Sequence, residues 1–236
     1  MALDVTELCW QSHTDKHHGE FPHSEMYDAL FHCFRDEPIT FLEIGVNKGG
    51  SIAVWEAYFP NATLLATDIK PKCLIRNTER TTVSLVDQFE PDQLRAYADE
   101  HGPFDVVIDD GSHYSSHQIL TLETLWPYMK PGGIFVIEDT ETSYVVEYLR
   151  AEGPGFSCVE YCKGLADTVH QRIADRPALW KDINTVMFKQ DMIVVTKREE
   201  PTRRLIPKKL PEDQGIKVSK KVRGYRDDIK RRHDGG

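Results

Sequence analysis

Carboxylates and a histidine follow an apolar run near the middle of the sequence, in a pattern that could bind a cation and accept a proton. In FDVVIDDGSH, residues 104–113, the run of residues 106–108 leads into Asp109 and Asp110, and His113 comes three positions later. A short apolar run of this kind is typical of a buried parallel strand. Because ligands in open α/β sheets bind outside the carboxyl ends of the strands, Asp110 and His113 are expected at a functional site.

A second apolar run, residues 133–137, ends at Glu138 and Asp139. If the two strands are neighbours, Glu138 and Asp139 come close to Asp110 and His113 at one edge of the sheet. Like charges at such distances are unfavourable unless a cation or a proton offsets them. The pattern therefore predicts a divalent metal ion at this edge.

The two adjacent aspartates are expected to differ in role. Neighbouring residues of a strand point to opposite faces, so we predict that Asp110 is the metal ligand. Asp109 would then lie behind Asp110 or on the cofactor side. His113 is predicted to be the general base, although a histidine at this position could instead cap the helix that follows.

A glycine-containing turn precedes this region in the chain and predicts a cofactor site. A strand over residues 39–46 runs into the turn of residues 47–51 and then into a helix, an arrangement that presents backbone N–H groups to a ligand. The spacing E-x-G-x-x-x-G, from Glu43 to Gly49, differs from G-x-G-x-x-G and makes a dinucleotide site less favoured. Asp68 ends the next strand about 20 residues beyond the turn, where an acid can accept hydrogen bonds from ribose hydroxyls. A tight strand-to-helix connection remains the alternative for the glycine turn alone.

The elements that would position these residues alternate between strand and helix. The fold class is therefore predicted to be α/β, a doubly wound parallel sheet, with a C-terminal antiparallel hairpin at the sheet edge. Two further segments, 140–150 and 160–173, suit helices that cap the site. The expected strands are residues 39–46, 63–69, 82–86, the apolar run 106–108 and residues 133–137, with the hairpin over 184–189 and 192–197; the expected helices between them are 52–59, 90–101 and 115–129.

Composition bounds the class of protein. The chain has 236 residues, 40% of them hydrophobic and 28% charged, which fits one globular domain of ordinary size. No apolar run approaches the roughly 20 residues of a membrane helix, so no membrane partner is expected. The five cysteines are scattered and suggest no disulfide or zinc pattern; we expect reduced thiols in a cytoplasmic protein.

Charge is unevenly distributed along the chain. The segment from residue 199 onward has 12 Lys/Arg and 7 Asp/Glu, so about +5 of charge lies there and about −14 in the rest, within a net charge of −9. An acidic body argues against an enzyme acting on nucleic acid. We expect an N-terminal helical lid over residues 1–38, a catalytic domain over 39–198 and a basic arm, extended or disordered, over 199–236.

The motifs resemble those of a known family. LEIGVNKGGS followed by Asp68 looks like the nucleotide half of the class I S-adenosylmethionine-dependent methyltransferases. The order of Thr14-Asp15-Lys16, a helix bearing a tyrosine, LEIGV-x-x-GGS, W-x-x-YFPNA, VDQ, IDDGSH and EDTETSY is similar to that in the magnesium-dependent sugar O-methyltransferases that decorate macrolides and other glycosides. The similarity extends over about residues 12–198. One departure is His23, where relatives often have a tyrosine one turn before Tyr27.

The resemblance implies a role for each matching residue. The cofactor would be S-adenosylmethionine, the metal ion Mg²⁺, and the partner a sugar or glycoside substrate, with a homo-oligomer expected. Asp110, Glu138 and Asp139 would bind the metal, and His113 would be the base. The residues implied in cofactor binding are Glu43, Gly45, Gly49 and Ser51 at the glycine turn, Asp68 at the ribose, Asp87 and Gln88 beside the adenine with Asp109 near them, and Asp15 and Lys16 over the amino-acid end.

The chemistry agrees with this implication but leaves alternatives open. A sugar hydroxyl has a pKa far above that of an imidazole, so a lone base is poorly matched to it. A divalent cation bound by a vicinal diol lowers that pKa and orients the oxygen. A catechol or another vicinal diol would be served equally well by the same site. A metal-dependent hydroxylase or hydrolase on the same fold, or a cofactor-binding module without catalysis, are alternatives of other classes.

Overall fold

A seven-stranded sheet forms the centre of the protein. The computed structural model describes residues 3–17, 23–149 and 157–199. The strand order is β3-β2-β1-β4-β5-β7-β6. The first five strands pair in parallel, whereas β7 pairs antiparallel with β5 and with β6. This confirms the predicted doubly wound sheet and its antiparallel edge hairpin. The strands are β1 (Thr40–Ile44), β2 (Thr63–Asp68), β3 (Thr81–Leu85), β4 (Phe104–Asp109), β5 (Met129–Glu138), β6 (Ile183–Lys189) and β7 (Met192–Lys197).

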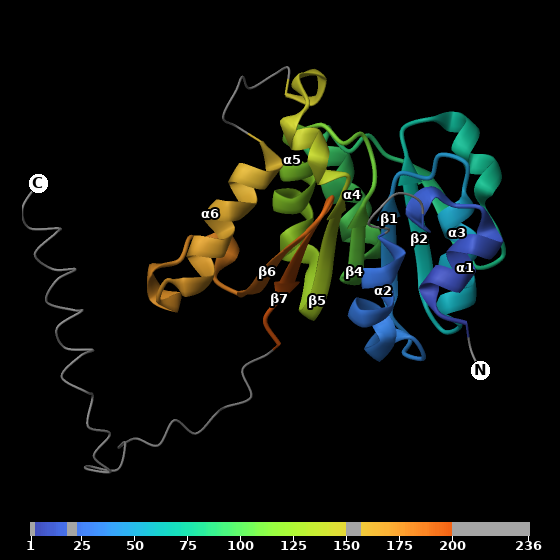
Figure 1. Cartoon of the computed structure of the whole chain (residues 1–236), viewed down its shortest axis with the longest axis horizontal. Coiled ribbons are helices and arrows are strands. Elements are labelled where there is room, and N and C mark those ends of the chain that lie inside the picture. The colour runs from blue at the N-terminus through green and yellow to red at the C-terminus, as the bar shows by residue number, and fades with distance from the viewer. Residues whose placement is uncertain (1–2, 18–22, 150–156, 200–236) are drawn as a thin grey trace, which may run out of the picture. The chain divides into compact units, whose positions relative to one another are not determined.

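Helices cover both faces of the sheet (Figure 1). Successive residues of the central strands pack on opposite sides: Val107 of β4 belongs to the apolar cluster formed with α4, α5 and α6, whereas Val106 and Ile108 belong to the cluster formed with α1, α2 and α3. Burial on both faces explains why these strands are continuous apolar runs in the sequence. The α-helices are α1 (Val5–Ser12), α2 (Ser24–Phe31), α3 (Gly50–Tyr58), α4 (Pro91–His101), α5 (Ser115–Leu125) and α6 (Cys158–His170).

The N-terminal segment is helical where it is described, and it packs on α3. Asp4 caps α1 in a capping box with Glu7. Val5 and Cys9 of α1 are fully buried in the same cluster as Tyr27 of α2. After α1 the chain makes a single 3-10 turn, Asp15–His17, which lies beside the carboxyl ends of the strands. The domain boundaries at residues 38 and 198 stay predictions.

One expected helix takes another form. Residues 140–150 were predicted to be an α-helix, but the structure has two short 3-10 turns, Thr140–Tyr144 and Val146–Tyr148. Asp139 starts this stretch with a left-handed φ of 54°, and four of the next seven residues are β-branched, which disfavours a regular helix.

Three further expectations concern a membrane helix, the cysteines and the C-terminal arm. Within the described ranges, no helix is long and apolar enough to cross a membrane. All five cysteines are free thiols, as predicted. The basic arm predicted for residues 199–236 lies outside the described residues, except for Glu199.

Candidate active site

A cavity of about 710 Å³ opens at the carboxyl ends of the parallel strands. This volume is in the range of small-molecule and cofactor sites. Glu43, Asp109 and Glu138 are not in its wall but lie buried beneath it. The structure brings these predicted residues together in the wall: Asp15, Lys16, Gly45, Gly49, Ser51, Asp68, Asp87, Gln88, Asp110, His113 and Asp139.

The glycine turn forms one side of the cavity. Gly45 has φ +96°, and a Cβ atom there would lie 2.0 Å from the backbone oxygen of Asp110. Gly49, with φ +78°, is the N-cap of α3, so the first N–H groups of that helix face the cavity side of the turn. Glycine is therefore required at both positions by conformation, and at Gly45 also by the close approach of β4.

Asp68 is held by three backbone N–H groups. Its Oδ2 accepts hydrogen bonds from the N–H of Val46 (3.0 Å) and of Asn47 (3.1 Å), and its Oδ1 accepts one from Lys70 (2.8 Å). Partial burial alone would raise the pKa of Asp68, but these hydrogen bonds outweigh it and lower that pKa. Asp68 is thus an ionised acceptor fixed at the end of β2, in the position expected for binding ribose hydroxyls.

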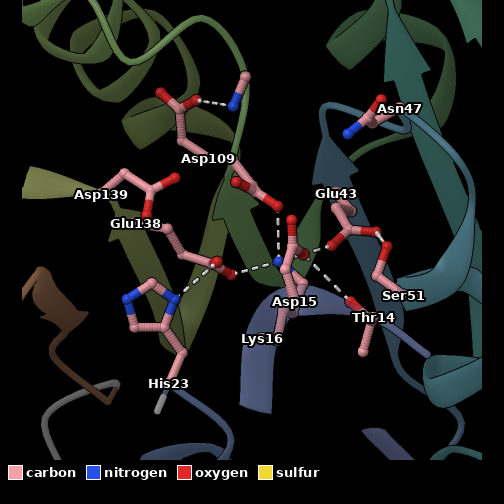
Figure 2. Close-up of polar contacts among 12 residues, drawn as sticks. Thr14, Asp15, Lys16, His23, Glu43, Asn47, Ser51, Asp109, Glu138 and Asp139 are labelled. Atoms are coloured by element: carbon pink, nitrogen blue, oxygen red, sulfur yellow. Dashed lines mark hydrogen bonds and ion pairs between the residues drawn. The ribbon is translucent and has the colours of Figure 1, made fainter. Parts of the chain in front are cut away.

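Asp109 and Gln88 form a buried pair between α5 and the cavity. The Nε2 of Gln88 donates to Asp109 Oδ1 (2.9 Å), and the N–H of Ser112 donates to Gln88 Oε1 (2.7 Å). Burial raises the pKa of Asp109 to about 6. Asp109 also accepts a hydrogen bond from the N–H of Gly111 in the turn before His113, and it lies away from the cluster around Lys16 (Figure 2).

A lysine stands among three buried or half-buried carboxylates. The Nζ of Lys16 lies 2.7 Å from Asp110 Oδ2, 2.6 Å from Glu138 Oε1 and 3.3 Å from Glu43 Oε1. Burial alone would lower the pKa of this ammonium, but the surrounding carboxylates hold it well above the usual value. Glu43 is in turn fixed by Ser51, whose Oγ donates to Glu43 Oε2 (2.6 Å).

Glu138 is fully engaged by the N-terminal segment. Its Oε1 accepts hydrogen bonds from Lys16 and from the hydroxyl of Tyr27, and His23 Nδ1 lies 3.0 Å from its Oε2 (Figure 2). Burial alone would raise the pKa of Glu138, but Lys16 and His23 lower it to about 2. Burial and the charge of Glu138 instead raise the pKa of Asp110 well above its usual range. Asp110 therefore binds a proton more readily than Glu138 does.

The remaining predicted residues converge beside this cluster. Asp110, His113 and Asp139 each offer one ligand atom, and these atoms lie within 4.8 Å of one another. His113 Nδ1 is buried, makes no hydrogen bond and lies 3.3 Å from Asp139 Oδ2. Thr142 anchors the pair, because its Oγ1 donates to the backbone oxygens of both His113 and Asp139. The carboxylate oxygens of Asp110 and Asp139 are hard ligands that fit a divalent ion such as Mg²⁺.

Glu138 departs from that grouping. It was expected to bind the metal with Asp110 and Asp139, yet both of its oxygens contact the N-terminal segment. Sequence reasoning also missed the contacts of His23 and Tyr27 with Glu138. The signals for them were the position of Tyr27 in a helix after the Thr14-Asp15-Lys16 motif and the position of His23 one turn before Tyr27.

The part of the chain that contains the cavity is similar to known proteins. Residues 42–140 match a family described as a methyltransferase domain. The chain contains a methyltransferase domain. The glycine turn, Asp68, Asp110, His113 and Glu138 all fall inside the matched residues, so this domain carries most of the candidate site.

Two curated relatives of this chain are O-methyltransferases whose names give glycosylated compounds as substrates. The chain is 36% identical over 194 residues to the 8-demethyl-8-alpha-L-rhamnosyl tetracenomycin-C 2'-O-methyltransferase of Streptomyces olivaceus, with 76% of this chain and 51% of the relative covered. It is 37% identical over 180 residues to the L-olivosyl-oleandolide 3-O-methyltransferase of Streptomyces antibioticus, covering 71% and 46%. The chain thus spans about half the length of the curated relatives it matches.

A solved structure shows the same arrangement of elements. The methyltransferase MycE, solved in complex with Mg, SAH and mycinamycin VI, superposes with a TM-score of 0.77 and 28% identity, covering 84% of this chain and 55% of MycE. The class I methyltransferase fold and the resemblance to sugar O-methyltransferases, both predicted from the motifs, are therefore confirmed for the methyltransferase domain.

Proposed function

We propose that this protein transfers the methyl group of S-adenosylmethionine to a hydroxyl of a sugar or glycoside, with the assistance of Mg²⁺. One observation carries the proposal: a single cavity joins the glycine turn and Asp68 to Asp110, His113 and Asp139. A cofactor at the first group would face an acceptor at the second. The relatives that methylate sugars, and the presence of Mg and SAH in MycE, support this choice of cofactor, metal and substrate class.

The cofactor half would bind S-adenosylmethionine through fixed groups. Asp68 would accept the ribose hydroxyls, and Asp87 and Gln88 would lie beside the adenine. The backbone at Gly45 and Gly49 would approach the methionine part closely, because neither residue has a side chain to block it. Glu43, Ser51 and Asp109 would support this wall from below, and Asp15 and Lys16 would close over the amino-acid end.

The acceptor half would hold and deprotonate the hydroxyl. Asp110, Asp139 and Glu138 would hold Mg²⁺, which, when bound, would lower the pKa of the acceptor hydroxyl and orient it. His113 would take the proton as the oxygen attacks the sulfonium methyl. With Nδ1 facing Asp139, Nε2 is the atom that would receive this proton. The protein would contribute chiefly by aligning the two reactants.

Calorimetric titration tests the binding steps. S-adenosylhomocysteine, and then Mg²⁺, would be titrated into wild type and into Asp110→Asn. We expect the cofactor product to bind both proteins with similar affinity and Mg²⁺ to bind wild type only. Absence of S-adenosylhomocysteine binding to wild type would overturn the methyltransferase proposal and favour a metal-dependent hydroxylase or hydrolase.

An activity panel tests the substrate class. Deoxysugar glycosides, free sugars and catechols would be offered with S-adenosylmethionine, with and without EDTA. We expect methylation of the glycosides, loss of activity with EDTA and recovery when Mg²⁺ is restored. Methylation of catechols alone would replace the sugar by the catechol alternative, with cofactor and metal unchanged.

A further inference from the structure

We propose that Lys16 is a positioning residue whose ammonium group serves as an internal cation for Asp110 and Glu138, and that a divalent metal ion must displace it from Asp110. The inference rests on the proposed metal-assisted function but goes beyond it. It makes the Thr14-Asp15-Lys16 segment a competitor of the metal as well as a part of the cofactor wall.

The geometry carries this inference. The Lys16 side chain is 2% exposed, and its Nζ contacts carboxylates at the carboxyl ends of three strands. These are Glu43, the second-last residue of β1, Asp110, the residue after β4, and Glu138, the last residue of β5. Figure 2 shows the lysine reaching between Glu43 and Glu138 from below the sheet edge. No other ammonium or guanidinium in the described ranges makes an ion pair with these three acids. Lys16 therefore supplies the compensating charge that such a buried acidic cluster requires.

A metal ion and the ammonium compete for the same oxygen. Lys16 Nζ is 2.7 Å from Asp110 Oδ2, whereas Mg²⁺ binds carboxylate oxygens at about 2.0–2.1 Å. An ion ligated by Asp110 would place two positive charges side by side around one carboxylate, which is unfavourable. Glu138 would keep the ammonium on Oε1 and would offer the ion its Oε2, which His23 contacts in the structure.

A movement of Lys16 can be detected through Trp10, because the turn that carries Lys16 contacts this tryptophan. Lys16 lies in the single 3-10 turn Asp15–His17, preceded by His13 with a left-handed φ of 54°. The ring of His17 lies 4.3 Å from the ring of Trp10 on α1. Trp10 is 63% exposed, so its fluorescence can report a shift of this turn without altering the core.

Metal affinity of a charge-free variant is the main test. Lys16→Met keeps most of the side-chain length and removes the ammonium. We expect its Kd for Mg²⁺, measured by calorimetry, to be about tenfold lower than that of wild type, because the apparent affinity rises when the competing state is removed. The matched control is Lys130→Met, since Lys130 Nζ pairs with Asp105 Oδ2 at 2.6 Å, away from the cavity wall; its Kd should equal that of wild type. A purely structural role for Lys16 would leave the affinity unchanged or weaken it, and either result would overturn the inference.

A second measurement uses the wild-type side chain and is independent of whether Lys16→Met folds. Addition of Mg²⁺ to wild type should change the Trp10 emission, and the change should be absent in Trp10→Phe. Metal binding detected by calorimetry with an unchanged Trp10 signal would mean that the ion binds without displacing Lys16, and would overturn the inference. Failure of Mg²⁺ to bind wild type would instead remove the metal-assisted function and this inference together, while S-adenosylhomocysteine binding would still test the methyltransferase function separately.

Discussion

The two halves of the cavity are held together by different forces. On the cofactor side, Asp68 is fixed by backbone N–H groups that are at most 22 residues away in the sequence. On the acceptor side, Glu138 is held by side chains of Lys16, His23 and Tyr27, which are 122, 115 and 111 residues away. One half is made by the local path of the main chain, the other by charges that meet only when the N-terminal segment docks.

This difference predicts different behaviour without ligands. Backbone donors stay in place once the β1 turn and the start of α3 have formed, so the cofactor side is preorganised. A cluster of buried carboxylates is stable only with a cation, and Lys16 provides one in the structure. The acceptor side therefore has to exchange partners when a metal ion binds, whereas the cofactor side does not.

The largest expected effect is that of replacing His113, and it tells whether this residue acts as the general base or as a metal ligand. We expect His113→Gln to lower kcat by about 10²–10⁴-fold, the usual contribution of a general base. Its Kd values for S-adenosylhomocysteine and Mg²⁺ should stay close to those of wild type. Steady-state kinetics and calorimetry check this, with His101→Gln on α4 as a histidine control remote from the cavity wall. A large loss of Mg²⁺ affinity would instead make His113 a ligand, as its place within 4.8 Å of Asp110 and Asp139 also permits.

The next effect is expected where the two halves touch. In Gly45→Ala, the new Cβ would meet the backbone oxygen of Asp110 at 2.0 Å and would have to be accommodated at φ +96°. We expect a loss of about 2–4 kcal/mol in the free energy of unfolding, from backbone strain and overpacking. Binding of both S-adenosylhomocysteine and Mg²⁺ should weaken, because the new methyl group would push the chain after β1 away from the chain after β4.

Urea unfolding with a matched glycine tests that expectation. Gly164 lies inside α6, and a Cβ there meets no atom within 4 Å. Gly164→Ala should therefore raise stability by about 0.5–1 kcal/mol through helix propensity. If Gly45→Ala unfolded at the same urea concentration as wild type, the two halves would not share the close contact that the structure shows.

The sequence was more informative about the cofactor side than about the acceptor side, because the contacts of the cofactor side are local in the chain. Apolar runs, the glycine turn and the acid at Asp68 are local patterns, so the strands and their polar ends could be read directly. The pairing of Asp109 with Ile137 in the β4–β5 ladder then brings Asp110 next to Glu138, as expected for neighbouring strands.

The partners of Glu138 could not be read in this way. Contacts across more than 100 residues depend on how α1 and α2 pack on α3, and no periodicity reports that packing. Lys16 was expected at the amino-acid end of the cofactor, and it does line the cavity, but its contacts with the acids came only from the structure. The helix predicted over residues 140–150 failed because the turn at Asp139 and the anchoring hydrogen bonds of Thr142 fix the backbone in another form.

The smallest expected effect is confined to the cofactor side. We expect Asp68→Asn to weaken S-adenosylhomocysteine binding by about 10–100-fold, the usual contribution of hydrogen bonds to a charged group. Mg²⁺ affinity should be unchanged, because Asp68 hydrogen-bonds to the backbone of Val46, Asn47 and Lys70 and to the thiol of Cys73, and not to Asp110, His113 or Asp139. Calorimetry of both ligands checks this, and a parallel loss of Mg²⁺ binding would show that the two halves are coupled through more than Gly45.

The same variant has a defined pH dependence. The hydrogen bonds lower the pKa of Asp68 in the folded protein, so its ionised form stabilises the fold above the unfolded pKa of about 3.9. The stability difference between wild type and Asp68→Asn, measured by urea unfolding, should be constant from about pH 7 to pH 5 and should shrink as the pH falls through the folded pKa. A difference that stayed constant down to pH 3 would mean that Asp68 acts through its shape and not through its charge. The cofactor side would then rely on backbone geometry alone, and charge would be a device of the acceptor side only.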